Sequence, residues 1–239
     1  MKLDILLMAA HPDDAEMSCA GTIASAIAKG KKVGIVDFTR GELGTRGTPE
    51  IRAAEAAAAS KILGVAAREN LGFRDGFYRN DEEHQLKLIT AIRRYKPEIV
   101  LANAIEDRHP DHGKGAALAV DACFLSGLRM IETFDTDGTK QDAWRPKALY
   151  HYIQDRYIKP DLVMDISDYW DIKEASIRAY KSQFYDPNSA EPESYLTSPE
   201  FLDFLKARSQ EMGHSIGAKF GEGYTKTKMI GINDFFTLI

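Results

Sequence analysis

Histidine and aspartate gather in two short segments of the chain, about a hundred residues apart. The first, AHPDDAE, runs from Ala10 to Glu16, and the second, DRHPDHG, runs from Asp107 to Gly113. Six of their side chains are our candidates to bind a metal or carry a proton: His11, Asp13, Asp14, His109, Asp111 and His112. A mixture of imidazole and carboxylate suits zinc or a similar divalent ion. We therefore expect one metal site built from both segments.

Such a site would be suited to hydrolysis. A catalytic zinc typically keeps three protein ligands and leaves a fourth position for water, whose pKa falls toward ~7. A remaining carboxylate can take the proton of the water, and a remaining histidine can stabilise negative charge or protonate a leaving amine. Pro12 and Pro110 each follow a histidine and stiffen the turn that carries it.

Each residue also has a plainer interpretation. Asp13 or Asp14 could cap the helix that begins near Ala15. A lone His11 would more often be an ordinary hydrogen-bonded histidine. The spacing alone does not say which aspartate binds the metal, but two clusters that the fold brings together favour a site over either interpretation.

The elements around these segments alternate between strands and helices. We expect strands at 3–8, 32–38, 69–73, 98–103, 148–153, 162–166 and 226–232. We expect helices at 15–28, 49–63, 82–95, 115–130, 168–184 and 199–212. This pattern predicts a single domain over residues 1–239, a Rossmann-like three-layer α/β/α fold with a mainly parallel sheet. In the strand order 3-2-1-4-5, the first and fourth strands are neighbours, so the two clusters should face each other beyond their carboxyl ends.

Three other motifs fail on their context. Gly213 to Gly217 spells G-H-S-I-G, but a helical pattern precedes Ser215 and no histidine follows it, unlike a nucleophile elbow. The first turn carries AHPDDAEMSCAG in place of the dinucleotide-binding GxGxxG. The loop GELGTRG lacks the GK[ST] ending of a phosphate loop, so we interpret it as a substrate loop or rim.

Composition excludes several classes of protein. The chain has 239 residues and 44% apolar content, enough to bury a core. A net charge of −5 leaves no basic surface for nucleic acid. Only two cysteines, Cys19 and Cys123, occur, which favours a reducing cytoplasm. No apolar stretch is long enough for a membrane helix. We expect a cytoplasmic protein without nucleic-acid or membrane partners and, from the apolar carboxyl-terminal third, a homo-oligomer.

Taken together, the motifs resemble the LmbE/PIG-L family of zinc-dependent N-acetylglucosamine deacetylases. The similarity rests on AHPDD and HPDH, and extends to IRAAEAAAA with Arg52 and Glu55, PDLVMDISD at 160–168 and AYKSQF at 179–184. It is greatest to the branch that removes acetate from N-acetyl-glucosaminyl L-malate in bacillithiol biosynthesis. The resemblance implies an LmbE-like fold, a small sugar substrate and one Zn²⁺ per chain, with another divalent metal such as Fe²⁺ as an alternative.

The resemblance also implies roles for individual residues. His11, Asp14 and His112 would be the metal ligands, and Asp13 the general base acting on water. His109 would stabilise the oxyanion or assist the leaving amine, with Asp111 orienting it.

Three residues are implied in substrate binding: Arg52, Tyr195 and Arg108. Cationic side chains at Arg46, Arg52 and Arg108 could pair with malate carboxylates. Two alternatives stay open. One is deacetylation of another N-acetylglucosamine compound, such as a chitin disaccharide or a thiol precursor, and the other is a metal- or sugar-binding module without catalysis.

Overall fold

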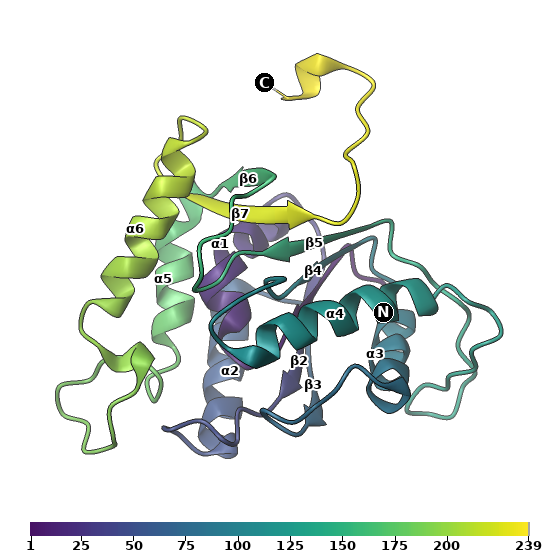
Figure 1. Ribbon diagram of the computed structural model, residues 1–239, viewed down its shortest axis with the longest axis horizontal. Coiled ribbons are helices and arrows are strands. Elements are labelled where there is room, and N and C mark those ends of the chain that lie inside the picture. The colour runs from purple at the N-terminus through teal and green to yellow at the C-terminus, as the bar shows by residue number, and fades with distance from the viewer. Residues whose placement is uncertain (239) are drawn as a thin grey trace.

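A seven-stranded sheet forms the centre of the protein in a computed structural model that describes residues 1–238 (Figure 1). The strands are β1 (Ile5–Ala9), β2 (Val33–Thr39), β3 (Ala67–Phe73), β4 (Ile99–Ala102), β5 (Ala148–Tyr152), β6 (Leu162–Asp165) and β7 (Gly221–Lys226). Their order is β3-β2-β1-β4-β5-β7-β6. β1 to β5 pair in parallel, whereas β7 runs antiparallel to β5 and β6. The expected mainly parallel sheet and its central strand order are confirmed.

Helices cover both faces of this sheet. They are α1 (Asp14–Ala28), α2 (Pro49–Leu63), α3 (Glu82–Tyr95), α4 (Pro110–Leu125), α5 (Trp170–Arg178) and α6 (Phe201–His214), with short 3-10 turns at Ser167–Tyr169, Tyr195–Thr197 and Phe235–Leu238. α3 and α4 pack together on one face, and α1, α2 and α5 pack together on the other. α6 lies beside α5 and against β7 (Figure 1). The three-layer α/β/α fold is confirmed.

β1 shows why the sheet makes a rigid base for the first cluster. Its sequence, ILLMA, is apolar throughout, as is typical of a parallel strand with helices on both faces. Leu6 and Met8 join the core on the α3/α4 side, whereas Leu7 and Ala9 join the core on the α1 side. The strand is thus held from both faces up to the residue before Ala10, where the first cluster begins.

The last strand lies earlier than the sequence predicts. The pattern predicts a strand at 226–232, but β7 spans Gly221–Lys226. Glycines are poor strand formers in general, and two of them occur in the first half of this strand. They are required here because α6 crosses close to β7: a Cβ on Gly221 would lie 2.8 Å from the main-chain nitrogen of Gly213. Packing against α6 therefore overrides the local propensity.

Two helices also have different limits. α4 begins at Pro110 rather than 115, because His109 acts as its N-cap and proline suits the first helical position. The helix expected at 168–184 is α5, which ends at Arg178. Just beyond that end, the N–H and hydroxyl of Ser182 both donate to Glu55 of α2 at 2.7 Å, so this amide does not continue the helix. Among residues 1–238, no helix combines the length and apolarity that a membrane span requires.

Candidate active site

The two clusters lie side by side at the carboxyl edge of the sheet. β1 and β4 are paired in parallel, and the chain leaves them toward α1 on one face and α4 on the other, which is the switch point where α/β proteins bind ligands. Asn103 joins the two loops. Its Oδ1 accepts from the N–H of Ala10 at 2.9 Å, and its Nδ2 donates to Asp14 Oδ2 at 3.1 Å. The sequence correctly predicted this juxtaposition.

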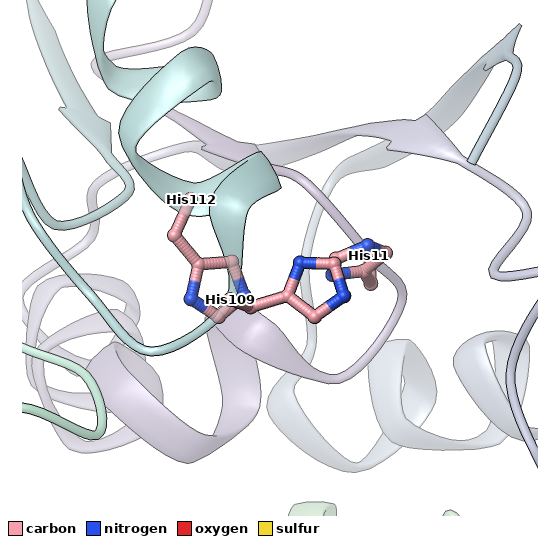
Figure 2. Close-up of side chains that lie close together, drawn as sticks. All are labelled: His11, His109 and His112. Atoms are coloured by element: carbon pink, nitrogen blue, oxygen red, sulfur yellow. The ribbon is translucent and has the colours of Figure 1, made fainter. Parts of the chain in front are cut away.

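Three imidazoles from the two loops point toward one another (Figure 2). The ring centroids of His11 and His109 are 4.6 Å apart, those of His109 and His112 are 5.3 Å apart, and those of His11 and His112 are 5.6 Å apart. One ring nitrogen from each lies within 4.8 Å of the others. The three rings are therefore close enough to share one ion.

Asp14 lies between two of these imidazoles. Its Oδ2 is 3.5 Å from His11 Nδ1, and its Oδ1 is 3.2 Å from His112 Nε2. The carboxylate is almost fully buried, and Gln154 Nε2 donates to Oδ1 at 3.0 Å. His11, Asp14 and His112 thus offer two nitrogens and a carboxylate around one point, which is a donor set that suits a divalent transition metal.

The outer nitrogens of both imidazoles are held by carboxylates that the sequence analysis did not single out. His11 Nε2 lies 3.0 Å from Asp75 Oδ1, and His112 Nδ1 lies 2.5 Å from Asp107 Oδ2. Carboxylates in this position fix the tautomer of a metal-binding histidine and orient its ring. Asp107 could have been noticed because it opens the segment DRHPDHG, whereas Asp75 stands in a loop with no recognisable pattern.

The surrounding charges raise the pKa of both histidines in the metal-free protein. Burial alone would lower the pKa of His112, but the charge of Asp14 and the hydrogen bond with Asp107 outweigh it and raise the pKa to about 9. Burial likewise opposes the charged form of His11, and hydrogen bonds with Asp111, Asp14 and Asp75 raise its pKa nonetheless. A site that holds positive charge on two imidazoles is one in which a cation can replace those protons.

Asp13 has an unusual backbone and a single strong partner. It is the residue before α1, at φ 115° and ψ −28°, and its side chain makes no capping hydrogen bond. The carboxylate instead accepts from Arg52 Nη2 at 2.8 Å, and its residue is only 4% exposed. Burial, partly offset by the charge of Arg52, raises the pKa of Asp13 to about 7. The helix-cap interpretation of Asp13 is therefore wrong.

The main chain of Asp111, rather than its carboxylate, holds His109. The N–H of Asp111 donates to His109 Nδ1 at 3.2 Å, so Nε2 carries the proton of the neutral ring. Burial, with the charges of His11 and His112, lowers the pKa of His109 and keeps it neutral. The Asp111 carboxylate has other partners, namely Gly76 N–H at 2.8 Å and Lys114 Nζ at 3.0 Å. It also lies 3.5 Å from His11 Nε2.

Comparisons with known proteins agree with this arrangement. The family model described as PIG-L, GlcNAc-PI de-N-acetylase, matches residues 6–123, which include both clusters. The conserved protein TT1542 of Thermus thermophilus is 37% identical in sequence, with a TM-score of 0.85 and 98% of each chain covered. The chain belongs to the PIG-L family. It is a carbohydrate N-deacetylase of that family, as the sequence predicted, and N-acetylglucosamine compounds are the class it deacetylates.

Two curated relatives bear on the activity of this PIG-L protein. Diacetylchitobiose deacetylase of Thermococcus kodakarensis is 28% identical over 191 residues, covering 75% of this chain and 70% of the relative. The 4-oxalmesaconate hydratase of Pseudomonas putida is 26% identical over 203 residues, covering 74% and 73%. The name of the Thermococcus relative supports deacetylation of an N-acetylglucosamine compound. Neither name refers to a malate glycoside, so these two relatives give no support to the bacillithiol assignment.

A cavity lined by His112 and Asp107 adjoins the histidine cluster of this PIG-L protein. Tyr195 and Arg108, both expected to contact substrate, line it. Tyr195 donates from its hydroxyl to Asp155 Oδ1 at 2.7 Å, and the Arg108 guanidinium lies over the Tyr195 ring, 4.1 Å from its centroid. Arg108 Nε also lies 3.5 Å from Asp155 Oδ2. Both side chains are partly exposed, so they stand where a ligand entering the cavity would meet them.

The other two arginines are occupied by the protein. Arg52 donates to Pro12 O at 2.5 Å and to Gly41 O at 3.3 Å in addition to Asp13, so it holds Asp13 and the rim loop in place. Arg46 donates to the carbonyl oxygens of Glu191 and Pro192 at 3.1 and 2.7 Å. Arg46 therefore braces a loop and is not a free cation in the pocket. A contact between Arg52 and substrate stays a prediction.

The loop GELGTRG lies next to the metal site, as its interpretation as a rim requires. The N–H of Leu43 donates to Asp75 Oδ2 at 3.1 Å. Glu42 Oε1 accepts from the N–H of Asp75 at 2.9 Å, while Glu42 Oε2 is buried without a hydrogen-bond partner. An unpaired buried acceptor costs free energy that a hydroxyl donor would recover. The motif G-H-S-I-G, by contrast, ends α6: the Ser215 hydroxyl donates to Met212 O.

Proposed function

We propose that this protein hydrolyses the N-acetyl group of a small N-acetylglucosamine glycoside, with zinc held by His11, Asp14 and His112. The observation that carries the proposal is the placement of Asp14 between two imidazoles whose outer nitrogens are held by Asp75 and Asp107. A metal-binding histidine almost always donates its other ring N–H to a carboxylate, a backbone carbonyl or water, and here both histidines have a carboxylate in that place.

The residues fit zinc by their chemistry. Two imidazole nitrogens and one carboxylate are the ligand set of many catalytic zinc sites, and Fe²⁺ tolerates the same donors. A bound zinc ion polarises the amide carbonyl and lowers the pKa of water at the site toward ~7. His109 Nε2 lies in the same cluster of imidazoles and provides a hydrogen-bond donor.

The protein's own residues account for the proton transfers. Asp13, with a pKa near 7, takes a proton from the attacking water. As the carbonyl becomes tetrahedral, the Nε2–H of His109 donates to its developing negative charge. The C–N bond then breaks, and the proton that Asp13 holds is available to the leaving amine. Acetate and a glucosamine moiety are the products.

Two features favour a sugar glycoside as the substrate. Glu42 Oε2, buried without a partner in the rim loop, leaves an acceptor near the site that a sugar hydroxyl would satisfy if the loop opened. Arg108 and Tyr195, at the cavity that adjoins His112, offer a cation and a ring to the substrate. A chitin disaccharide is the first substrate to assay, because the Thermococcus relative is named for it. N-acetyl-glucosaminyl L-malate is the second, because Arg108 provides one partner for its carboxylates.

Acetate release from these two compounds tests the proposal. We expect equal amounts of acetate and free amine, loss of turnover with a chelator and recovery with zinc or Fe²⁺. The Glu106→Gln variant serves as a control because Glu106 is exposed and bonds only Arg156 among the contacts seen here. If no acetate is released while water adds to an unsaturated dicarboxylate, the chain is a hydratase like its Pseudomonas relative and the proposal is wrong.

A further inference from the structure

The cavity beside the metal site has an apolar interior. It extends from His112 between α1, α6 and β7. Most of its deep wall is hydrocarbon or thioether, from Met17, Ile153, Leu196, Phe201, Leu205 and Met212. Methionine side chains adapt to ligands of varied shape.

Two buried charged groups in the cavity wall, Glu222 and Lys173, are already paired. Glu222 Oε1 accepts from the N–H of Gly21 and from Lys173 Nζ at 2.9 and 2.6 Å. Its Oε2 accepts from the N–H and hydroxyl of Thr22 at 2.8 and 2.6 Å. Across residues 1–238, the buried polar atoms that lack a partner belong to side chains outside this cavity. Glu222 and Lys173 therefore offer no unmet charge to a ligand, and the apolar part of the wall suits an apolar group.

The two sides of the metal site differ in character. Beyond His11 lie the carboxylates of Asp75 and Asp111 and, through Asp75, the unpaired oxygen of Glu42. Beyond His112 the cavity begins, with Gln154 at its entrance. An amide whose carbonyl meets the metal carries its sugar on one side and its acyl substituent on the other. An alkyl chain needs no hydrogen-bond partner and matches the apolar part of the cavity wall, whereas each sugar hydroxyl needs a partner, so we assign the cavity to the acyl substituent.

We infer that the cavity is an acyl subsite, and that this enzyme also hydrolyses N-acylglucosamines whose acyl chains are longer than acetyl. The inference rests on the proposed deacetylase function. The reaction is the same hydrolysis: one water adds, the C–N bond breaks, and a fatty carboxylate and a glucosamine amine leave. Burial of each added methylene raises kcat/KM about fourfold until the chain fills the cavity, from the transfer free energy of a CH₂ group.

A series of glucosamine amides tests the inference with the zinc-loaded full-length protein. N-acetyl, N-butanoyl, N-hexanoyl and N-octanoyl derivatives are compared by the amine that each releases. We expect kcat/KM to rise from acetyl to hexanoyl. If the acetyl compound is hydrolysed and the hexanoyl compound is not, the acyl subsite is wrong while the deacetylase proposal stands. If none of the four, and neither glycoside, is hydrolysed, both proposals fail.

Matched variants on α6 locate the subsite. Leu205 lines the cavity, whereas Leu202, one turn earlier and equally half-buried, does not. Leu205→Trp should lower the ratio of kcat/KM for hexanoyl over acetyl at least tenfold, and Leu202→Trp should leave that ratio unchanged. If Leu205→Trp does not fold, as judged by thermal unfolding, Leu196→Trp in the adjoining turn fills the same cavity. An equal ratio in wild type and a folded cavity variant overturns the assignment.

Calorimetric binding of the carboxylate products gives a readout that does not depend on turnover. We expect hexanoate to bind the zinc-loaded protein at least tenfold more tightly than acetate, and the advantage to disappear in the Leu205→Trp variant. Equal affinities of hexanoate and acetate for the wild-type protein would contradict the subsite.

Discussion

Replacing Asp107 with asparagine should weaken zinc binding without touching a zinc ligand. The Asp107 side chain is fully buried, and its two oxygens have separate tasks. Oδ1 accepts from the N–H of Arg156 at 2.7 Å, and Oδ2 lies 2.5 Å from His112 Nδ1. In Asp107→Asn the Arg156 amide still requires an oxygen, so the new amide nitrogen must take the place of Oδ2. It then presents a donor to His112 Nδ1 and favours the tautomer whose proton sits on Nε2, where the metal should bind.

The expected loss is tenfold to a hundredfold in affinity, since supporting carboxylates of this kind have such effects. That corresponds to about 1.4 to 2.7 kcal/mol of binding free energy. The assay is competition for zinc between the purified variant and a chromogenic chelator at neutral pH. Glu106→Gln is the matched control: it neutralises the adjacent acidic residue, which is exposed and bonds only the side chain of Arg156 among its contacts here.

An affinity within twofold of wild type would refute this account of Asp107. A lower melting temperature with unchanged zinc affinity would show that Asp107 serves only to hold the loop at Arg156. A loss of affinity in Glu106→Gln as large as in Asp107→Asn would show that local charge, rather than the hydrogen bond to His112, sets the affinity.

Three further predictions test the proposed base Asp13, the proposed zinc ligand His112 and the packing of α6 at Gly213. Asp13→Asn should lower turnover on acetylated substrate about 10²- to 10⁴-fold and keep its zinc, because the proposed base is removed and no zinc ligand is changed. His112→Ala should lose zinc. Equal zinc loss in metal analysis of both variants would contradict the assignment of Asp13 as base and His112 as ligand. Since His112 has a pKa of about 9 without metal, zinc must displace its proton, so calorimetric zinc affinity should rise from pH 6.5 to about 9, and a flat profile would exclude this competition. Gly213→Ala should lower the free energy of unfolding by about 1 to 3 kcal/mol, because its Cβ would lie 2.7 Å from the main chain of Phe220. Thermal unfolding measures the loss, with Gly231→Ala as the control because a Cβ there meets open space. Equal stability of the two variants would argue against tight packing of α6 on β7.

The sequence predicted the centre of the sheet because its strands are long apolar runs bounded by turn residues. The meeting of the two clusters followed from strand order alone, and no contact had to be known in advance. β7 was misplaced because Gly221 and Gly223 are favoured there by the approach of α6, which local propensity does not record. Helix ends such as that of α5 depend on a partner from a distant helix.

The outer part of the site could not be predicted in the same way. Asp75 and Glu42 are single acidic residues in loops, and they act only because the fold brings them to His11. The arginines show the converse limit. Arg46, Arg52 and Arg108 look alike in the sequence, yet the first braces a loop, the second holds Asp13, and the third lies over Tyr195. Which task a guanidinium performs is decided by the oxygens that the folded chain places within its reach.

The backbone conformation of Asp13 costs free energy that its contact with Arg52 helps to offset. A non-glycine residue at φ 115° is strained by about 1 to 3 kcal/mol, and Asp13 also forgoes a capping hydrogen bond worth about 1 kcal/mol. Glycine would relieve the strain, but would leave Arg52, which is 4% exposed, without its carboxylate. The conformation turns the Asp13 carboxylate away from the amides of α1, where a cap would hold it, and toward Arg52. The proposed role of Asp13 as a base beside Asp14 requires a carboxylate that is not held by the amides of the helix, which is the arrangement observed.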